Sequence, residues 1–253
     1  MRRAFFTSPL TPHYLLLRDA LRLTHTRTRM LTTDTSQAPC NICGGREFDL
    51  GPNDRKSATG KLPRCIACQS LERHRQLRQV YAQFPVSYLA GLEVLQLSPD
   101  IGVDPRWFKS YEVSVFGGEN SLNLEAIDRA DASYDLVICN HVLEHVADDR
   151  QGLRELLRIT RPEGFVQVTV PTPYTRAVTV DWGYPRSESH GHYRGYGRDF
   201  LQLFHAVHPQ ATALQVETSD VVTSAGGYVY LWTRHQPLVE RMKTWISNPI
   251  EAA

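Results

Sequence analysis

The sequence lacks the features that place a protein in a membrane or on a polyanion. It contains no uninterrupted run of about 18 or more apolar residues, so a membrane-spanning helix is not predicted. Its 28 Lys and Arg nearly cancel its 27 Asp and Glu, and the net charge of +1 gives no overall electrostatic case for nucleic acid or an anionic membrane. Apolar and charged fractions of 42% and 22% indicate a folded, soluble chain and exclude disorder throughout. A length of 253 residues suits one α/β domain with an appendage.

Cysteine is scarce and regularly spaced, which argues against the disulfide framework of a secreted domain. Four of the five cysteines form two Cys-x-x-Cys pairs, in "CNICGG" at 40–45 and "CIACQS" at 65–70. This pattern indicates a bound metal and a reducing compartment, for which we expect the cytoplasm. Four thiolates make a closed, tetrahedral and structural zinc site. We therefore predict structural Zn²⁺ at Cys40, Cys43, Cys65 and Cys68, the alternative being four unrelated buried or redox cysteines.

Acidic residues are almost absent from residues 1–38, where Asp19 is the only one before Asp34. This composition, with many arginines, is typical of an organelle transit peptide. Composition alone rarely proves targeting, so we favour a disordered tail or a true start at Met30. The arginines concerned are Arg2, Arg3, Arg18, Arg22, Arg27 and Arg29.

A helix is predicted directly after the second cysteine pair, with Ser70 as its N-cap. Residues 71–90 would connect a zinc knuckle, residues 39–70, to the domain that follows. The expected apolar stripe is Leu71, Leu77, Tyr81 and Phe84. Three arginines lie outside it, for which a solvated face is the commoner explanation and contact with phosphate the alternative: Arg73, Arg75 and Arg78.

From Leu92 onward, short strands alternate with helices or loops. This alternation predicts an α/β fold with a mostly parallel sheet covered on both faces. Ligands of such sheets bind beyond the carboxyl ends of the strands, where "SPDIGVD" and "NHVLEHV" lie. The predicted strands are Leu92–Leu97, Tyr111–Val115, Tyr134–Cys139, Phe165–Val170, Ala213–Glu217 and Tyr228–Thr233, with helices near 148–160 and 197–207.

One motif at this edge suggests a different chemistry. His141, Glu144 and His145 fit the H-x-x-E-H spacing of the inverzincin metallopeptidases. Such histidines bind one metal only if they lie a turn apart on an established helix. The preceding run reads as a buried strand, and a helix pattern is convincing only from Asp148. The motif straddles the end of a strand, which weakens the peptidase interpretation without removing it.

Several of these segments together resemble a known family. The runs "YDLVICNHVLEHVADD", "RPEGFVQVTVP" and "HYRGYGRDF" are similar to the class I S-adenosylmethionine-dependent methyltransferases. A four-cysteine knuckle followed by "SLERHR" resembles a bacterial group of that family, and the resemblance runs from about Cys40 to Trp232. It implies a Rossmann-like, seven-stranded, mostly parallel sheet with an antiparallel last strand. It also implies S-adenosylmethionine as cofactor, bordered by His141 to His145, which would then not bind zinc. The cofactor contacts implied by position are Leu97, Ser98, Asp100, Gly102, Asn140 and His141.

Two features depart from the family pattern. The family usually has a glycine-rich turn after the first strand, whereas "LQLSPDIGVD" offers only Gly102. It also tends to place an acid at the end of the second strand. Here the nearest acid is Glu119, which Gly117-Gly118 could bring toward the cofactor. Glu119 therefore joins the expected cofactor contacts, and loss of cofactor binding would leave a catalytically degenerate, zinc-containing scaffold.

Residues 172–197, rich in Tyr, His, Arg and Gly, are expected to form a substrate lid. Methyl transfer needs an in-line approach and at most one base for the acceptor proton. His192 is the first candidate, because an unperturbed histidine pKa of about 6.5 suits neutral pH, and His190 and Tyr196 come next. The alternative is that His192 and Arg194 only hold the lid by hydrogen bonds.

The leading hypothesis is methyl transfer to a small molecule or a glycan-like hydroxyl by a domain over residues 91–235, followed by a C-terminal helix or tail at 236–253. The alternative within enzymes is an RNA methyltransferase whose zinc module holds the substrate, for which the arginines of the connecting helix are the only sign.

Overall fold

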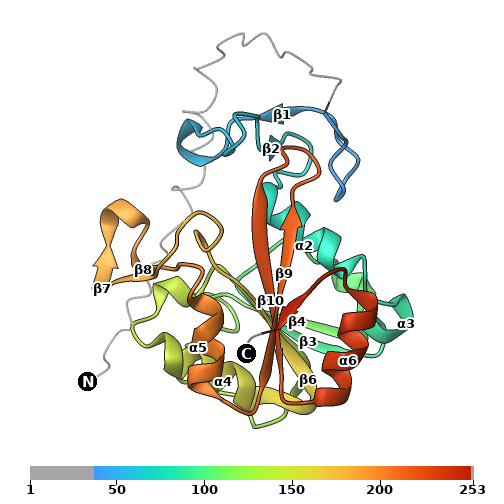
Figure 1. The fold of residues 1–253 in the computed structure, drawn as a ribbon, viewed down its shortest axis with the longest axis vertical. Coiled ribbons are helices and arrows are strands. Elements are labelled where there is room, and N and C mark those ends of the chain that lie inside the picture. The colour runs from blue at the N-terminus through green and yellow to red at the C-terminus, as the bar shows by residue number, and fades with distance from the viewer. Residues whose placement is uncertain (1–36, 252–253) are drawn as a thin grey trace, which may run out of the picture. The chain divides into compact units, whose positions relative to one another are not determined.

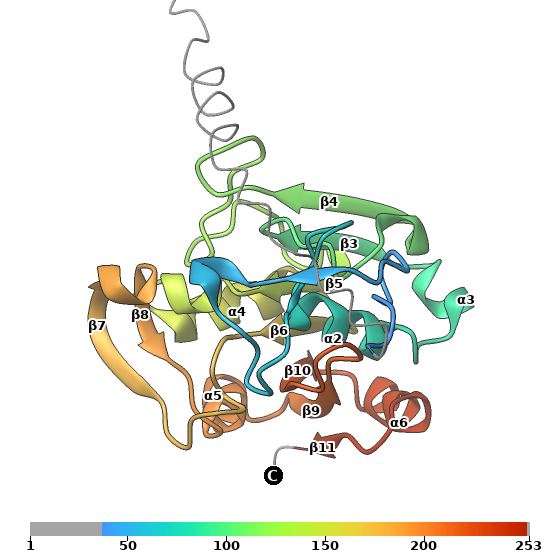
Figure 2. The same ribbon diagram turned by 90° about the horizontal axis from the view of Figure 1, so that it is seen from above.

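A seven-stranded sheet with helices on both faces forms the centre of the protein (Figure 1). The computed structural model describes residues 37–251, which belong to one compact unit, so most of the predicted N-terminal tail lies outside the described residues. The strand order is β11-β9-β10-β6-β5-β3-β4, and Figure 2 shows β4 and β11 at opposite ends. The strands are β3 Glu93–Leu97, β4 Ser110–Ser114, β5 Tyr134–Asn140, β6 Thr160–Thr169, β9 Thr212–Ser219, β10 Gly226–Thr233 and β11 Ile250–Glu251.

The sheet is mixed, which corrects the expectation of a mostly parallel one. The β3–β4, β3–β5 and β5–β6 pairs are parallel. The β6–β10, β10–β9 and β9–β11 pairs are antiparallel, because the C-terminal part of the chain returns as a hairpin and then adds β11 at the edge. All six predicted strands form, the last strand of the sheet, β11, is antiparallel to its neighbour β9, and β10 is antiparallel to both of its neighbours. β6 begins at Thr160, before the predicted start, since Tyr134 pairs with Thr160 across a register shift.

Two apolar cores lie on opposite faces of the sheet, as the placement of the helices in Figure 1 shows. Helix α4, Asp149–Ile159, buries Leu153, Leu156 and Leu157 on one face. Its N-cap is Asp148, whose carboxylate accepts a hydrogen bond from the backbone N–H of Gln151. The same face carries α5, Phe200–Val207, and the other carries α2 Glu72–Tyr81, α3 Val86–Leu89 and α6 Gln236–Trp245.

A small module precedes the sheet and packs against the turn between β9 and β10. It contains β1 Phe48–Asp49, a 3₁₀ helix Pro52–Asp54 and β2 Arg64–Cys65. Helix α2 begins after Leu71, so the expected N-cap at Ser70 is wrong. The backbone N–H of Leu71 donates instead to Nδ1 of His74, and the Ser70 hydroxyl lies 3.2 Å from the sulfurs of Cys40 and Cys68.

The connecting helix also lacks the predicted three-arginine solvated face. Arg75 is fully buried and pairs with Asp220, with Nε–Oδ1 and Nη2–Oδ2 distances of 2.6 and 2.8 Å. Arg78 is half-buried, with its guanidinium 4.4 Å from the ring centroid of Trp107. Only Arg73 of the three is exposed, so the observation that suggested an RNA substrate does not hold for the other two.

No helix within residues 37–251 has the length and apolar character needed to span a membrane. The parallel strands all end at one edge of the sheet, at Leu97, Ser114, Asn140 and Thr169. The loops above this edge include the 3₁₀ turn η3 Leu143–His145 and the separate hairpin of β7 Val180–Arg186, η4 Ser187–Ser189 and β8 His192–Gly195, whereas the 3₁₀ turn η2 Pro105–Trp107 precedes the start of β4 at the opposite edge.

Candidate functional site

A cavity of about 530 Å³ opens at the carboxyl ends of β3, β4 and β5. This volume is within the range of roughly 300–1,000 Å³ that small-molecule sites occupy. Its walls are largely apolar, and the polar residues among them include one acid, Glu125. The lining includes Leu97, Ser98, Ser114, Val115, Phe116, Leu122, Leu124, Glu125, His141, His145 and Tyr193. Leu97, Ser98 and His141 of the predicted cofactor residues therefore come together here.

The turn after β3 does without the family's glycines. Ser98 adopts the left-handed conformation with φ 67°, and its backbone N–H donates to the carbonyl of Ser114. His141, directly after β5, has φ 52° and its N–H donates to the carbonyl of Thr169. Non-glycine residues in this region cost about 1–3 kcal/mol each and cluster at functional sites. The backbone thus turns sharply at two strand ends on the cavity wall.

Asp100 and Gly102 lie outside the cavity lining and serve packing against α2 instead. The Asp100 carboxylate accepts from the N–H of Gly102 at 2.6 Å and lies 3.7 Å from Nε2 of His74. Burial lowers the pKa of His74 to about 4, so this contact is not an ion pair at neutral pH. A Cβ at position 102 would come within 3.0 Å of the carbonyl oxygen of His74, which explains the glycine without a cofactor.

Glu119 also lies outside the lining, although it was the acid expected near the cofactor. Glu125 takes the place beside the cavity and accepts from the N–H of Asp148 at 2.7 Å. Phe116, 80% exposed, presents an aromatic ring at the same wall. Sequence reasoning missed Glu125 and Phe116 because both belong to an irregular loop, where no periodicity fixes which side chain turns inward.

Asn140 is buried and holds two strand ends together. Its Oδ1 accepts from Nε2 of Gln167 and Oγ1 of Thr169, at 2.9 and 2.7 Å. Its Nδ2 has no hydrogen-bond partner among the described residues. The Oδ1 of Asn140 thus positions the ends of β5 and β6 beneath His141, and the contact of Asn140 with the cofactor stays a prediction.

A second cavity of about 480 Å³ lies on the other side of His141. It is bounded by the small module, the start of α2, the end of β6 and the start of β10. His141 lines both cavities and so forms part of the wall between them. The second lining includes Arg55, Glu72, Arg73, Gln76, Thr169, Tyr174 and Tyr228. Arg55 and Glu72 form a two-bond ion pair at 2.8 Å on this wall.

The predicted lid contains the β7–β8 hairpin, which is fastened to the loop after β5. Arg194 on β8 is buried, and its Nη atoms donate to the carbonyls of Val146 and Ala147 at 2.8 and 2.6 Å. Its Nε lies 3.0 Å from a carboxylate oxygen of Asp181 on β7. For Arg194 the structural alternative is therefore the correct one: the side chain holds the hairpin by hydrogen bonds.

The three candidate bases differ sharply in their surroundings. Tyr196 is buried, with its hydroxyl 2.9 Å from Asp149 Oδ2, and burial raises its pKa well above the ordinary value, so it does not fit a base role. His190 is exposed at the hairpin turn. The His192 ring lies edge-on to His145 with centroids 4.7 Å apart, and burial lowers its pKa, which leaves it neutral at pH 7.

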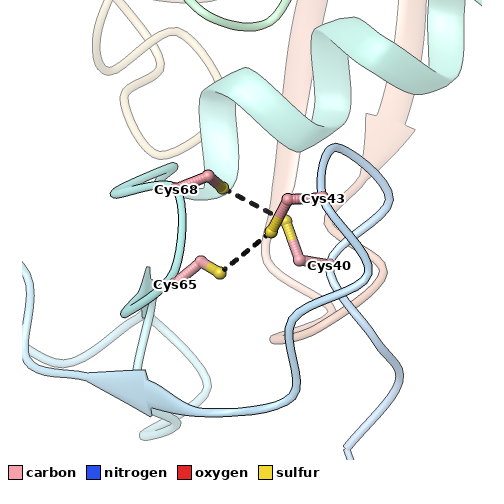
Figure 3. A group of neighbouring side chains, drawn as sticks. All are labelled: Cys40, Cys43, Cys65 and Cys68. Atoms are coloured by element: carbon pink, nitrogen blue, oxygen red, sulfur yellow. Dashed lines mark hydrogen bonds between the residues drawn. The ribbon is translucent and has the colours of Figure 1, made fainter.

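The four paired cysteines gather into one cluster (Figure 3). The sulfurs of Cys40 and Cys68 are 3.7 Å apart and those of Cys43 and Cys65 are 3.5 Å apart. Tetrahedral zinc with Zn–S bonds of about 2.3 Å requires S···S separations of ~3.8 Å, so the geometry fits the metal. Gly44 has φ 76° in the first loop. A Cβ at Gly45 would lie only 3.1 Å from the Cys65 sulfur, so glycine leaves room for the cluster.

Part of the chain matches a model of a known protein family. Residues 118–168 match the family model described as a methyltransferase domain. This stretch contains β5, η3, α4 and most of β6, and hence one wall of the first cavity. The match covers this segment of the chain alone, and the expected enzyme class, an S-adenosylmethionine-dependent methyltransferase, is confirmed at this level. No curated protein sequence matches the chain significantly.

Similar solved structures include other methyltransferases. The N-methyltransferase NodS from Bradyrhizobium japonicum is 12% identical, with a TM-score of 0.43 over 63% of this chain and 93% of that one. A 1,6-didemethyltoxoflavin-N1-methyltransferase from Burkholderia thailandensis is 14% identical, with a TM-score of 0.40 over 62% and 76%. A possible histamine N-methyltransferase from Thermotoga maritima is 12% identical, with a TM-score of 0.39 over 64% and 89%. At such low identities and TM-scores, these similarities do not bear on the activity of this chain.

Proposed function

We propose that the protein transfers a methyl group from S-adenosylmethionine, bound in the first cavity, to a hydroxyl of a small or glycan-like acceptor in the second. One observation supports this above the others: His141 lines both cavities at the carboxyl edge of the sheet. Two ligands that must react in line need adjoining sites with a shared wall, and this edge is where α/β sheets bind ligands.

The first cavity suits a nucleoside with a charged tail. Leu122, Leu124 and Phe116 offer an apolar and aromatic surface to a purine, and Glu125 offers a carboxylate to ribose hydroxyls. The bound cofactor supplies an activated methyl group on a sulfonium. The chain supplies position, because the left-handed turns at Ser98 and His141 bring two backbone segments to the cavity wall.

The second cavity suits a polar acceptor with a flat apolar face. Tyr174 and Tyr228 pack with ring centroids 5.2 Å apart on its wall, and Arg73 and Gln76 supply hydrogen-bond donors. Aromatic faces beside such donors fit a sugar-like molecule. We also propose that the four cysteines hold a structural zinc, because all four ligand positions are filled by protein.

Binding of the demethylated cofactor S-adenosylhomocysteine tests this proposal. At a ligand concentration of 100 times Kd, the protein should gain about 2.7 kcal/mol of stability, read as a rise in Tm. Phe116→Ala should weaken binding by about 1–3 kcal/mol if the ring stacks on adenine. Because Phe116 is 80% exposed, the unliganded Tm should stay unchanged. Val86→Ala, at a 78% exposed valine on α3, is the matched control and should leave Kd unaltered. Absence of binding by zinc-loaded protein would favour a scaffold.

Kinetics should separate the roles of two histidines once an acceptor is found with labelled cofactor. His192→Ala should lower kcat by about 10²–10³-fold with the cofactor Kd nearly unchanged. His141→Ala should raise the Kd of the cofactor and affect kcat less, since its side chain borders the cavity. His205→Ala, an exposed histidine on α5, provides the comparison. If both variants lowered only Tm, the histidines would be structural.

A further inference from the structure

The side chains of Glu144, His145 and His192 converge above the carboxyl edge of the sheet. Ligand atoms of Glu144, His145 and His192 all lie within 4.8 Å of one another. Glu144 and His145 belong to the turn η3, and His192 begins β8 in the hairpin. Sequence spacing could not show this group, because His192 follows His145 only after the whole of α4, β6 and β7.

The carboxylate of Glu144 is the unusual member. The side chain is 1% exposed, and its Oε1 lies 3.5 Å from Nδ1 of His141. Its Oε2 has no hydrogen-bond partner among the described residues. A buried carboxylate oxygen without a partner costs several kcal/mol unless a proton or a cation satisfies it. The neighbouring imidazole nitrogens make a cation the better fit, since each can offer a lone pair beside the carboxylate oxygen.

We propose that Glu144, His145 and His192 bind a divalent transition-metal ion. Two imidazoles and one carboxylate are a set that binds zinc or iron while leaving coordination positions open. The site differs from the H-x-x-E-H peptidase pattern, because His141 is not a member of the converging group and η3 is a single 3₁₀ turn. It is also separate from the four-cysteine cluster, whose ligand positions are all filled by protein.

The location of the ion suggests that it activates the acceptor hydroxyl; this role rests on the function proposed above. His145 lines the first cavity, and His141, in contact with Glu144, lines both. The ion would border the first cavity at His145, so an acceptor hydroxyl that reaches past His141 from the second cavity would occupy one of its open positions beside the methyl group. An ion lowers the pKa of a bound hydroxyl, so its proton passes to solvent water. The oxygen lone pair then forms the O–CH₃ bond as the S–CH₃ bond breaks, and the sulfonium becomes a neutral thioether. His192 would thus act on the acceptor through the metal and not as a free base.

Metal binding can be measured without any acceptor. Mn²⁺ and Co²⁺ are titrated into the full-length, zinc-loaded protein, in which the thiolates are already occupied, and binding is followed by the Mn²⁺ EPR signal and by Co²⁺ absorption bands. We expect one ion per chain, with no thiolate charge-transfer band. Loss of partners that only support metal ligands costs about 10–100-fold in affinity, so loss of a ligand should cost at least ~100-fold. Glu144→Gln and His192→Ala should each weaken binding to this extent.

Two further variants separate loss of a metal ligand from misfolding and from loss of any histidine. His145 is exposed, so His145→Ala should keep Tm and zinc content while losing the second ion. His205→Ala, at the exposed histidine on α5, should bind it as the wild type does. Failure of both Mn²⁺ and Co²⁺ to bind, or equal binding by wild type and His145→Ala, would overturn the site. S-adenosylhomocysteine binding is measured separately: if it binds and the metals do not, this inference fails alone, and the reverse result leaves the metal site standing while the proposed methyl transfer fails.

Discussion

Replacing Cys65 with serine should abolish zinc binding and unfold or aggregate the small module. Structural zinc sites contribute about 10–16 kcal/mol of apparent binding free energy, most of which serves folding. The apolar core of the module within the described residues is only a small cluster around Cys40, Phe48, Cys65 and Val222, so the metal should carry much of its stability. Zinc content by elemental analysis and Tm by calorimetry measure the loss.

The matched control for this change is Cys139→Ser. Cys139 is buried in β5 and burial raises its pKa far above the ordinary value, so it is an inert core thiol. Its replacement should lower Tm modestly and leave one zinc per chain. A Cys65→Ser protein that kept its full zinc complement and its Tm would contradict the assignment of the four cysteines.

Asp220→Ala should lower the free energy of unfolding by about 3–5 kcal/mol, the usual cost of leaving a buried charge without its partner. Both side chains of the Arg75–Asp220 pair are 0% exposed. Asp220 also accepts from the N–H and hydroxyl of Thr223 at 2.9 and 2.7 Å, so two further bonds are lost. Denaturant unfolding of the zinc-loaded protein measures the change.

Two comparisons sharpen this test. The double replacement of Arg75 by Met and Asp220 by Leu should recover much of the loss, because no charge is then left unpaired. Lys243→Ala removes two partly exposed ion pairs, to Glu240 on α6 and Glu251 on β11, and should cost at most ~1 kcal/mol. Similar decreases in the free energy of unfolding for Asp220→Ala and Lys243→Ala would show that the buried Arg75–Asp220 pair contributes no more to stability than an exposed pair.

The sheet was predictable because its strands leave a strong local signal. β5 contains the unbroken apolar run Leu136–Cys139, and Asp148 and Pro162 flank the helix between β5 and β6, so the order of elements follows from the sequence pattern. The two-residue β11 escaped prediction because strands this short are set by pairing with β9 and not by composition. Arg75 was expected on a solvated face because its partner, Asp220, is 145 residues away in the sequence, and no local pattern reveals such a contact.

The candidate site was predictable only where a residue ends a strand. Leu97, Ser98 and His141 line the cavity because the carboxyl ends of parallel strands share one edge. Asp100, Gly102 and Glu119 lie two or more residues into loops, where a turn decides which way each side chain points. The convergence of Glu144 and His192 depends on how a hairpin folds back, which no local pattern contains.

The hydrogen bonds of Arg194 limit how often the β7–β8 hairpin can open. Swinging the hairpin away would separate a 4% exposed guanidinium from the carbonyls of Val146 and Ala147, whereas Asp181 on β7 would move with it. At about 1.5–3 kcal/mol for each of these two charge-assisted hydrogen bonds, an open hairpin would be populated in roughly one molecule in 10²–10⁴. Amide hydrogen exchange along β8 should accordingly be slow with or without ligand. Entry and release would then pass through the mouths of the two cavities, and the β7–β8 hairpin would behave as a fixed wall of the site.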